Sequence, residues 1–148
     1  VCFEVRPKLQ NFKNSNTRCL NNVLNRATAH VQVFDNKEDY HQFEEIREEA
    51  VERHDMRLLA YCLMPNHWHL ALHPREDGDL SRFTSWLTNT HTRRWHVVKD
   101  TMGEGHLYQG RYKSFICWNQ LLDSQVDPKK VADLISLFYS ITTRRCAT

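Results

Sequence analysis

The sequence lacks the features that define several large classes of protein. No apolar run in its 148 residues approaches the ~18 residues of a membrane-spanning helix, and no stretch combines a basic start with an apolar centre, as a signal peptide does. The five cysteines are scattered and form no CxxC pair, which argues against a zinc ribbon or a disulfide framework. We therefore expect a cytoplasmic protein with reduced thiols and no membrane partner. Because the chain begins with Val1, we expect the true start to lie upstream.

A large excess of charge is also missing. Lys and Arg number 20 against 18 Asp and Glu, which gives a net charge of +2. That balance permits binding to nucleic acid without requiring it, so local clusters of charge matter more than the total. With 41% hydrophobic and 26% charged residues the composition is that of a globular protein, and the length suits one domain over residues 1–148.

Hydrophobic periodicity predicts alternating strands and helices after a polar, aperiodic arm over residues 1–19. The predicted strands cover residues 19–26, 56–64, 67–73 and 111–118. The predicted helices cover residues 35–54, 80–99 and 127–145, with Asp35 or Asn36 capping the first and Asp127 the last. A two-strand hairpin between helices favours an antiparallel sheet with helices mainly on one face. The predicted fold class is therefore α+β, of the ferredoxin-like kind.

The predicted strand 67–73, with the sequence HWHLALH, carries three histidines on one face. Because strand side chains alternate, His67, His69 and His73 point one way and the apolar residues between them point toward the helices. Two imidazoles at i and i+2 lie side by side and suit a divalent cation. The residues alone also allow half-exposed histidines without a ligand, or zinc on all three. Two histidines do not complete a metal site, so a further ligand must come from elsewhere.

Cationic and aromatic residues recur on two other predicted elements. Arg93 and Arg94 lie near the end of the second helix, and Arg111 and Lys113 alternate with Tyr112 on the last strand. Cations that hold phosphates beside aromatic rings on which bases stack are typical of a groove for single-stranded DNA. Taken singly, the same residues are equally typical of solvated helix-end charges and core aromatics.

Several segments together resemble one family. AYCLMPNHWHLAL resembles the core signature of the REP-associated tyrosine transposases, which belong to the single-strand DNA transposases with a His-hydrophobic-His motif. VLNR, VFDNKEDYHQF, LSRFTSWLTNTHTRRWH and GEGHLYQGRYKSF resemble the family's neighbouring blocks and follow in the family's order. The resemblance covers about Val23 to Trp118.

The resemblance implies an activity, a cofactor and a partner. His67 and His69 match the family's metal ligands, for magnesium or manganese, whereas His73 matches no ligand and is expected to be a neighbour. A tyrosine hydroxyl would cut single-stranded DNA beside repeat hairpins through a covalent phosphotyrosine. Single-stranded or hairpin DNA would be the partner, and the protein would act as a homodimer. The matched residues expected at the DNA, beside Arg93 and Arg94, are Tyr108, Gln109, Arg111 and Lys113.

The resemblance ends where the family carries its nucleophile. The family has a Tyr-x-x-x-Asn-Pro motif on a C-terminal helix, and no such motif occurs in residues 119–148. Tyr139 is the only tyrosine there, followed by Thr143 and Arg144 in place of Asn and Pro. Tyr139 is therefore a candidate nucleophile, although packing is the simpler interpretation of its helical position. The alternative is a catalytically inactive, DNA-binding remnant whose nucleophile helix was lost by frameshift or truncation.

Overall fold

The computed structural model describes residues 2–4, 19–28, 31–119, 136 and 140. Most of the helix predicted over residues 127–145, including Tyr139, lies outside these residues. The described helices and strands are β1 (Cys2–Glu4), β2 (Cys19–Arg26), α1 (Lys37–His54), β3 (Arg57–Met64), β4 (His67–His73), α2 (Asp79–Lys99) and β5 (Lys113–Asn119).

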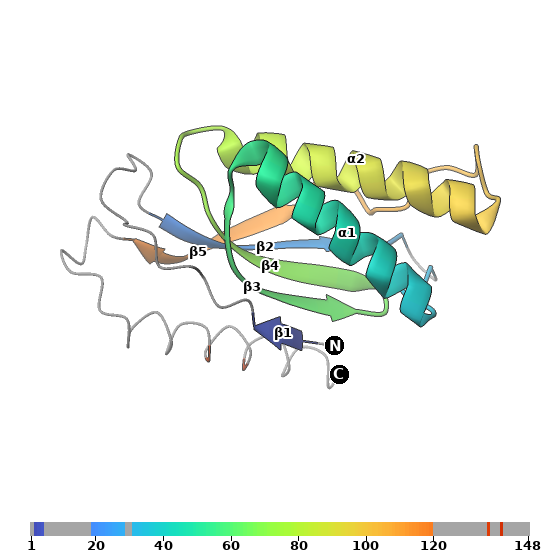
Figure 1. Cartoon of the computed structure of the whole chain (residues 1–148), viewed down its shortest axis with the longest axis horizontal. Coiled ribbons are helices and arrows are strands. Elements are labelled where there is room, and N and C mark those ends of the chain that lie inside the picture. Colours follow the sequence, from blue (N-terminus) through green and yellow to red (C-terminus); the bar gives the residue numbers. More distant parts are fainter. Residues whose placement is uncertain (1, 5–18, 29–30, 120–135, 137–139, 141–148) are drawn as a thin grey trace.

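The strands form one antiparallel sheet in the order β1-β3-β4-β2-β5. Both helices pack on the same face of this sheet (Figure 1). From β3 to β5 the order is that of a ferredoxin-like sheet, so the predicted α+β class is confirmed. The expectation of a structureless arm over residues 1–19 is wrong for β1, which pairs with the edge of β3. Three residues carry too little pattern to predict a strand that depends on a distant partner.

The apolar face of β4 builds the core beneath the helices. Trp68, Leu70 and Leu72 are fully buried, as strand alternation predicts. They pack in one cluster with side chains from β2 and from both helices, among them Val23, Phe43, Ile46, Phe83 and Leu87. Burying this much apolar surface fixes the register of β4, because a slip by one residue would turn Trp68 to the opposite face.

Helix α1 begins at a capping box. The side chain of Asn36, a predicted cap, accepts from the backbone N–H of Asp39 at 2.9 Å, and the Asp39 carboxylate accepts from the Asn36 N–H. Lys99 near the end of α2 donates to the same carboxylate at 2.9 Å. Asp39 therefore ties the start of α1 to the end of α2.

The cysteines depart from one expectation. Cys19 is free, but Cys62 on β3 is disulfide-bonded, so the expectation of reduced thiols is wrong for Cys62. The strand β1 brings Cys2 to the register position of Cys62, and the spacing of cysteines along the chain cannot reveal such a placement. Among the described residues, no helix is both long and apolar enough to cross a membrane.

Candidate metal and nucleic-acid site

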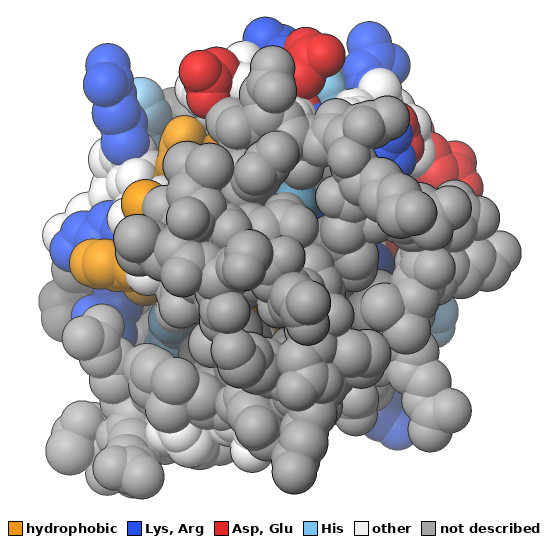
Figure 2. All heavy atoms as spheres, turned by 90° about the vertical axis from the view of Figure 1, so that its left-hand side faces the viewer, with side chains coloured by type: hydrophobic (Ala, Val, Ile, Leu, Met, Phe, Trp, Pro, Cys, Tyr) orange, Lys and Arg blue, Asp and Glu red, His pale blue; other side chains and the backbone are white. Residues whose placement is uncertain are grey.

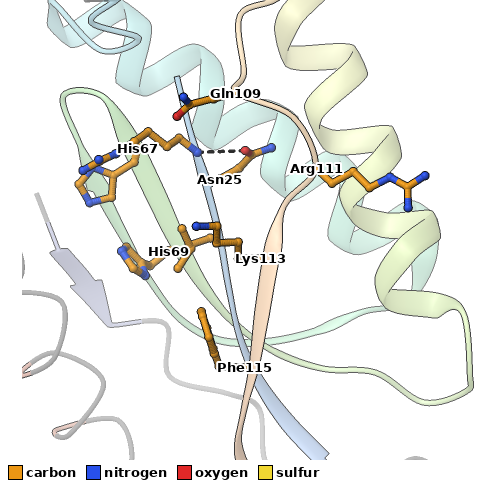
Figure 3. Close-up of a pocket in the computed structure, with 9 residues that line it drawn as sticks. Asn25, His67, His69, Gln109, Arg111, Lys113 and Phe115 are labelled. Carbon is orange, nitrogen blue, oxygen red and sulfur yellow. Dashed lines mark hydrogen bonds between the residues drawn. The ribbon is translucent and has the colours of Figure 1, made fainter. Parts of the chain in front are cut away.

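A cleft of about 280 Å³ lies on the sheet where β4, β2 and β5 run side by side. Figure 3 shows that the sheet strands and the segment before β5 supply its walls. The residues that line it are Leu24, Asn25, Arg26, His67, His69, Gln109, Arg111, Lys113 and Phe115.

Strand register explains why residues distant in the chain meet in this cleft. Leu24 on β2 pairs with His69 on β4 and with Lys113 on β5. Arg26, two residues further along β2, pairs with His67. Residues paired across antiparallel strands point to the same face, so both histidines and Lys113 share the face away from the apolar side of β4. The cleft thus combines imidazole, ammonium and guanidinium groups.

The two histidines are held as a pair. Their ring centroids lie 5.3 Å apart with planes inclined at 73°. Nδ1 of His67 lies 2.6 Å from Oδ1 of Asn66, and Nδ1 of His69 lies 3.3 Å from Oδ1 of Asn22. An amide oxygen can only accept, so each Nδ1 donates its hydrogen to the neighbouring asparagine. Such contacts orient metal-binding histidines in proteins.

Burial keeps His67 neutral. Its pKa is lowered from the usual value, chiefly by desolvation and secondly by the positive charge of Arg26. Only a neutral imidazole binds a metal ion, so a lowered pKa extends metal competence to more acidic pH. His69 is even more enclosed, with 4% of its surface exposed. The sequence predicts the face on which these histidines lie but not that depth.

The donor set fits two positions of a divalent metal site. The described residues contain no group of three or more His, Cys, Asp and Glu side chains that could hold a metal ion. That finding overturns the alternative of zinc on His67, His69 and His73. His73 is buried at the other end of β4, paired with Arg57, and does not line the cleft. The two imidazoles thus supply part of a ligand set.

A buried hydrogen-bonded chain supports the histidine strand from behind. The indole N–H of Trp68, between the two histidines, donates to the Tyr108 hydroxyl at 2.9 Å. The hydroxyl lies 2.5 Å from Nδ1 of His91 on α2. Burial raises the pKa of Tyr108 and lowers the pKa of His91 to about 3, so both groups are neutral. Because Tyr108 already accepts from Trp68, its O–H donates to His91.

Tyr108 also fixes the segment that leads into the cleft. Tyr108 forms an isolated bridge with Ala27, and the backbone N–H of Gln109 donates to the carbonyl of Arg26 at 2.8 Å. Tyr108 is 7% exposed, and its contacts orient both β4 and Gln109. Its predicted contact with DNA stays a prediction.

The other predicted DNA contacts separate into two groups. Gln109 and Lys113 line the cleft with the histidines, whereas Arg111 extends away from them toward α2 (Figure 3). Arg111 precedes β5, so strand alternation does not govern its direction. Arg94 forms an ion pair with Glu49 on α1 at 2.7 Å, and Arg93 is exposed on α2. Neither of these two lines the cleft.

A second cleft, of about 610 Å³, lies between α2 and the start of β5. It shares two residues, Asn25 and Arg111, with the histidine cleft. The other residues that line it are Ser81, Ser85, Thr88, Gly110, Tyr112 and Ser114. We call it the hydroxyl groove. Sequence reasoning missed it, and also missed Asn22, Asn66 and His91, because single polar residues carry no periodic signal.

Comparisons with known proteins give one family and one fold. Residues 11–126 match the model of a family described as transposase IS200 like. A solved structure from Deinococcus radiodurans R1, described as a transposase, shares 16% identity over 89% of this chain and 97% of that one, with a TM-score of 0.56. A REP-associated tyrosine transposase bound to a REP hairpin shares 12% identity over 74% of this chain and 62% of that one, with a TM-score of 0.54. No curated protein matches the chain.

Proposed function

The chain belongs to the IS200-like transposase family, and on that premise we propose that its histidine cleft binds single-stranded DNA and carries out metal-dependent cleavage and rejoining. The observation that carries the proposal is the meeting of His67 and His69 with Lys113 in one cleft. Imidazoles for a metal and a cation for a phosphate are what strand cleavage requires at one phosphate group.

The residues of the cleft divide the work by their chemistry. Lys113 and Arg26 would attract the phosphate and offset its charge, and Gln109 would hydrogen-bond to the backbone or a base. His67 and His69, oriented by Asn66 and Asn22, would hold magnesium or manganese. Such a metal supplies Lewis acidity at the scissile phosphate. Burial lowers the pKa of His67 and so favours its neutral, metal-binding form.

The nucleophile would be a tyrosine hydroxyl. Its oxygen attacks phosphorus, the bond from phosphorus to a sugar oxygen breaks, and that oxygen takes up a proton while the phosphate stays on the tyrosine. The reverse attack by a DNA hydroxyl rejoins the strand without water. We propose Tyr139, which lies outside the described residues, because it is the only tyrosine in residues 119–148, where the family carries its nucleophile. The buried hydroxyl of Tyr108 is committed to Trp68 and His91.

The partner we propose is single-stranded DNA with a hairpin. Support comes from the solved REP-associated transposase of the same fold, which is bound to a REP hairpin. We place the reaction in the cytoplasm and propose a homodimer. β5 is the last strand of the described sheet and exposes Phe115 and Ile116 at 50% and 65%, surfaces that suit a second copy. Light scattering that reports a monomer at micromolar concentration would exclude the dimer.

Metal binding by the histidine pair can be tested directly. Mn²⁺ titration followed by electron paramagnetic resonance should give a bound signal in the full chain. His69→Ala should weaken binding by at least tenfold, because it removes one of the proposed ligands. His41→Ala is the matched control, since His41 is exposed on α1 and outside the cleft. Equal loss in both variants, or no loss in either, would reject the cleft as the metal site.

A further inference from the structure

The hydroxyl groove lies along one side of α2. Ser81, Ser85 and Thr88 follow one another at i, i+4 and i+7, so they form a single row on the helix. Phe83 and Leu87 face the core, and Arg94 reaches α1 on the far side. The row therefore faces neither the core nor α1 but the start of β5, where Tyr112 and Ser114 form the opposite wall.

The groove offers hydroxyl groups and one cation, and no carboxylate. Within the described part of the chain, the hydroxyls of Ser81 and Ser85 make no hydrogen bond, whereas Thr88 donates to the carbonyl of Thr84 and Ser114 donates to Asn21. Arg111 forms no ion pair with any described residue. No carboxylate lines the groove. Donors with one cation and no anion select an anionic ligand rich in oxygen acceptors.

Asn25 gives an independent indication of a ligand. It is buried at 4% exposure, and its Oδ1 accepts from the backbone N–H of Arg26 at 2.9 Å. The amide nitrogen of Asn25 is therefore the atom that does not contact Arg26. Figure 3 shows this nitrogen pointing toward the side of Arg111. That nitrogen has no hydrogen-bond partner among the described residues. This nitrogen is not among the fully enclosed side-chain atoms that lack a partner, so it opens to the groove, where a ligand oxygen can accept from it.

The groove is continuous with the histidine cleft. Asn25 and Arg111 line both, and Arg111 extends toward α2 while Lys113, two residues later, stays with the histidines. A chain of phosphates leaving the histidine cleft would thus meet Arg111 first and the serine row next. Tyr112, half-buried on the groove wall, offers a ring on which a base can stack.

We propose that the hydroxyl groove binds the sugar–phosphate backbone of the nucleotides that flank the phosphate held at His67 and His69. This proposal rests on the proposed function and adds a second subsite to it. Arg111, Ser81, Ser85 and the Asn25 amide donate to phosphate oxygens. Because phosphate contacts carry no sequence information, the groove sets the path and register of the strand and not its sequence.

Charge placed in the groove tests the proposal. The variant Ser85→Glu puts a carboxylate in the serine row, and Asn89→Glu puts the same charge on an exposed position one turn later, outside the groove. Both positions are exposed, so both variants should fold, which thermal melting checks. Affinity for oligothymidylates of graded length is measured by fluorescence anisotropy at fixed salt. Arg111→Gln serves as a second groove variant, and His67→Ala reports on the cleft.

The expected result depends on oligonucleotide length. Ser85→Glu and Arg111→Gln should lower affinity by about tenfold for long oligothymidylates and little for the shortest ones, which fill the cleft alone. Asn89→Glu should stay within about twofold of the parent at every length. If Ser85→Glu and Asn89→Glu lower the affinity equally while His67→Ala still binds more weakly than the parent, the proposed role of the groove is rejected. The proposed role of the cleft is then retained. Unchanged binding in all variants, His67→Ala included, would overturn both.

Discussion

At the scale of single residues, Tyr108 joins three parts of the molecule. Its hydroxyl accepts from Trp68 on the histidine strand and donates to His91 on α2, while the backbone of Tyr108 forms a bridge with Ala27 just after β2. The family resemblance matches Tyr108 to a family position but does not predict that its side chain is buried. A histidine in the apolar stripe of α2 likewise gives no sign that it is a hydrogen-bond acceptor. The supporting chain therefore could not be predicted from the sequence, although the histidine pair was.

Removing that hydroxyl should cost stability and metal affinity together. Tyr108→Phe leaves the buried Trp68 N–H without its acceptor, which should lower the free energy of unfolding by about 1–3 kcal/mol. Because Trp68 lies between His67 and His69, Mn²⁺ affinity should fall as well. Urea denaturation and Mn²⁺ titration measure the two effects. Tyr40→Phe, whose hydroxyl has no hydrogen-bond partner among the described residues, should change each by far less.

The buried imidazole of His91 predicts a pH dependence of stability. Its pKa is lowered to about 3 by burial, against about 6.5 in the unfolded chain. The unfolded state therefore binds the proton first, so His91's contribution is complete above pH 6.5 and falls as the pH drops toward 3. Within that window the slope is up to ~1.4 kcal/mol per pH unit. Between pH 7 and pH 5, the free energy of unfolding measured in urea should fall by less in His91→Asn than in the parent.

A parent and variant that lose equal stability between these two pH values would contradict the neutral assignment of His91. The burial of His67 and His73 lowers their pKa values too, and both act in the same direction. The comparison within one background isolates His91, because those two groups are present in parent and variant alike.

At the scale of elements, periodicity predicts most of the fold. The alternation in residues 67–73 places Trp68 in the core, and Asn36 is one of the two caps predicted for the first helix. Errors arise where tertiary contacts override the pattern. Val98, an apolar residue near the end of α2, is 61% exposed because the helix continues beyond the sheet and α1. Arg111 lies before β5 and lines both clefts, so alternation along a strand does not determine its direction.

The junction of α1 and α2 makes its own prediction. The buried Asp39 carboxylate accepts from two backbone N–H groups and from Lys99. Asp39→Ala removes the reciprocal half of the capping box and leaves the Lys99 ammonium group without its partner, so the free energy of unfolding should fall by about 2–3 kcal/mol. Glu38 is exposed in the same helical turn, so Glu38→Ala should lower the free energy of unfolding by less than about 0.5 kcal/mol. Similar losses in the two variants, measured in urea, would contradict the role of Asp39 as a junction.

On the scale of the whole molecule, charge is arranged locally rather than in excess. Figure 2 shows hydrophobic side chains adjoining Lys and Arg at one margin of the described surface, while acidic side chains gather elsewhere. The net charge of +2 gives no indication of this local arrangement. Proposed DNA affinity should consequently depend on a few phosphate contacts and not on the total charge.

Salt dependence measures those contacts. The logarithm of the association constant for oligothymidylate should fall linearly with the logarithm of salt concentration, by about 0.7 per phosphate contacted. Lys113→Gln should reduce the slope by about 0.7, since Lys113 lies in the cleft. Lys37→Gln, which makes the same charge change at an exposed position on α1, should leave the slope unchanged. A slope near zero in the parent would argue against DNA as the partner.

The proposed cutting of DNA strands in the histidine cleft can be tested by incubating the full chain with a single-stranded hairpin oligonucleotide and Mn²⁺. A denaturing gel then shows whether a covalent protein–DNA adduct has formed. We predict an adduct in the parent and in His41→Ala, none in His69→Ala, and loss in Tyr139→Phe. An adduct of undiminished yield in His69→Ala, or binding with no adduct in the parent, would contradict the claim.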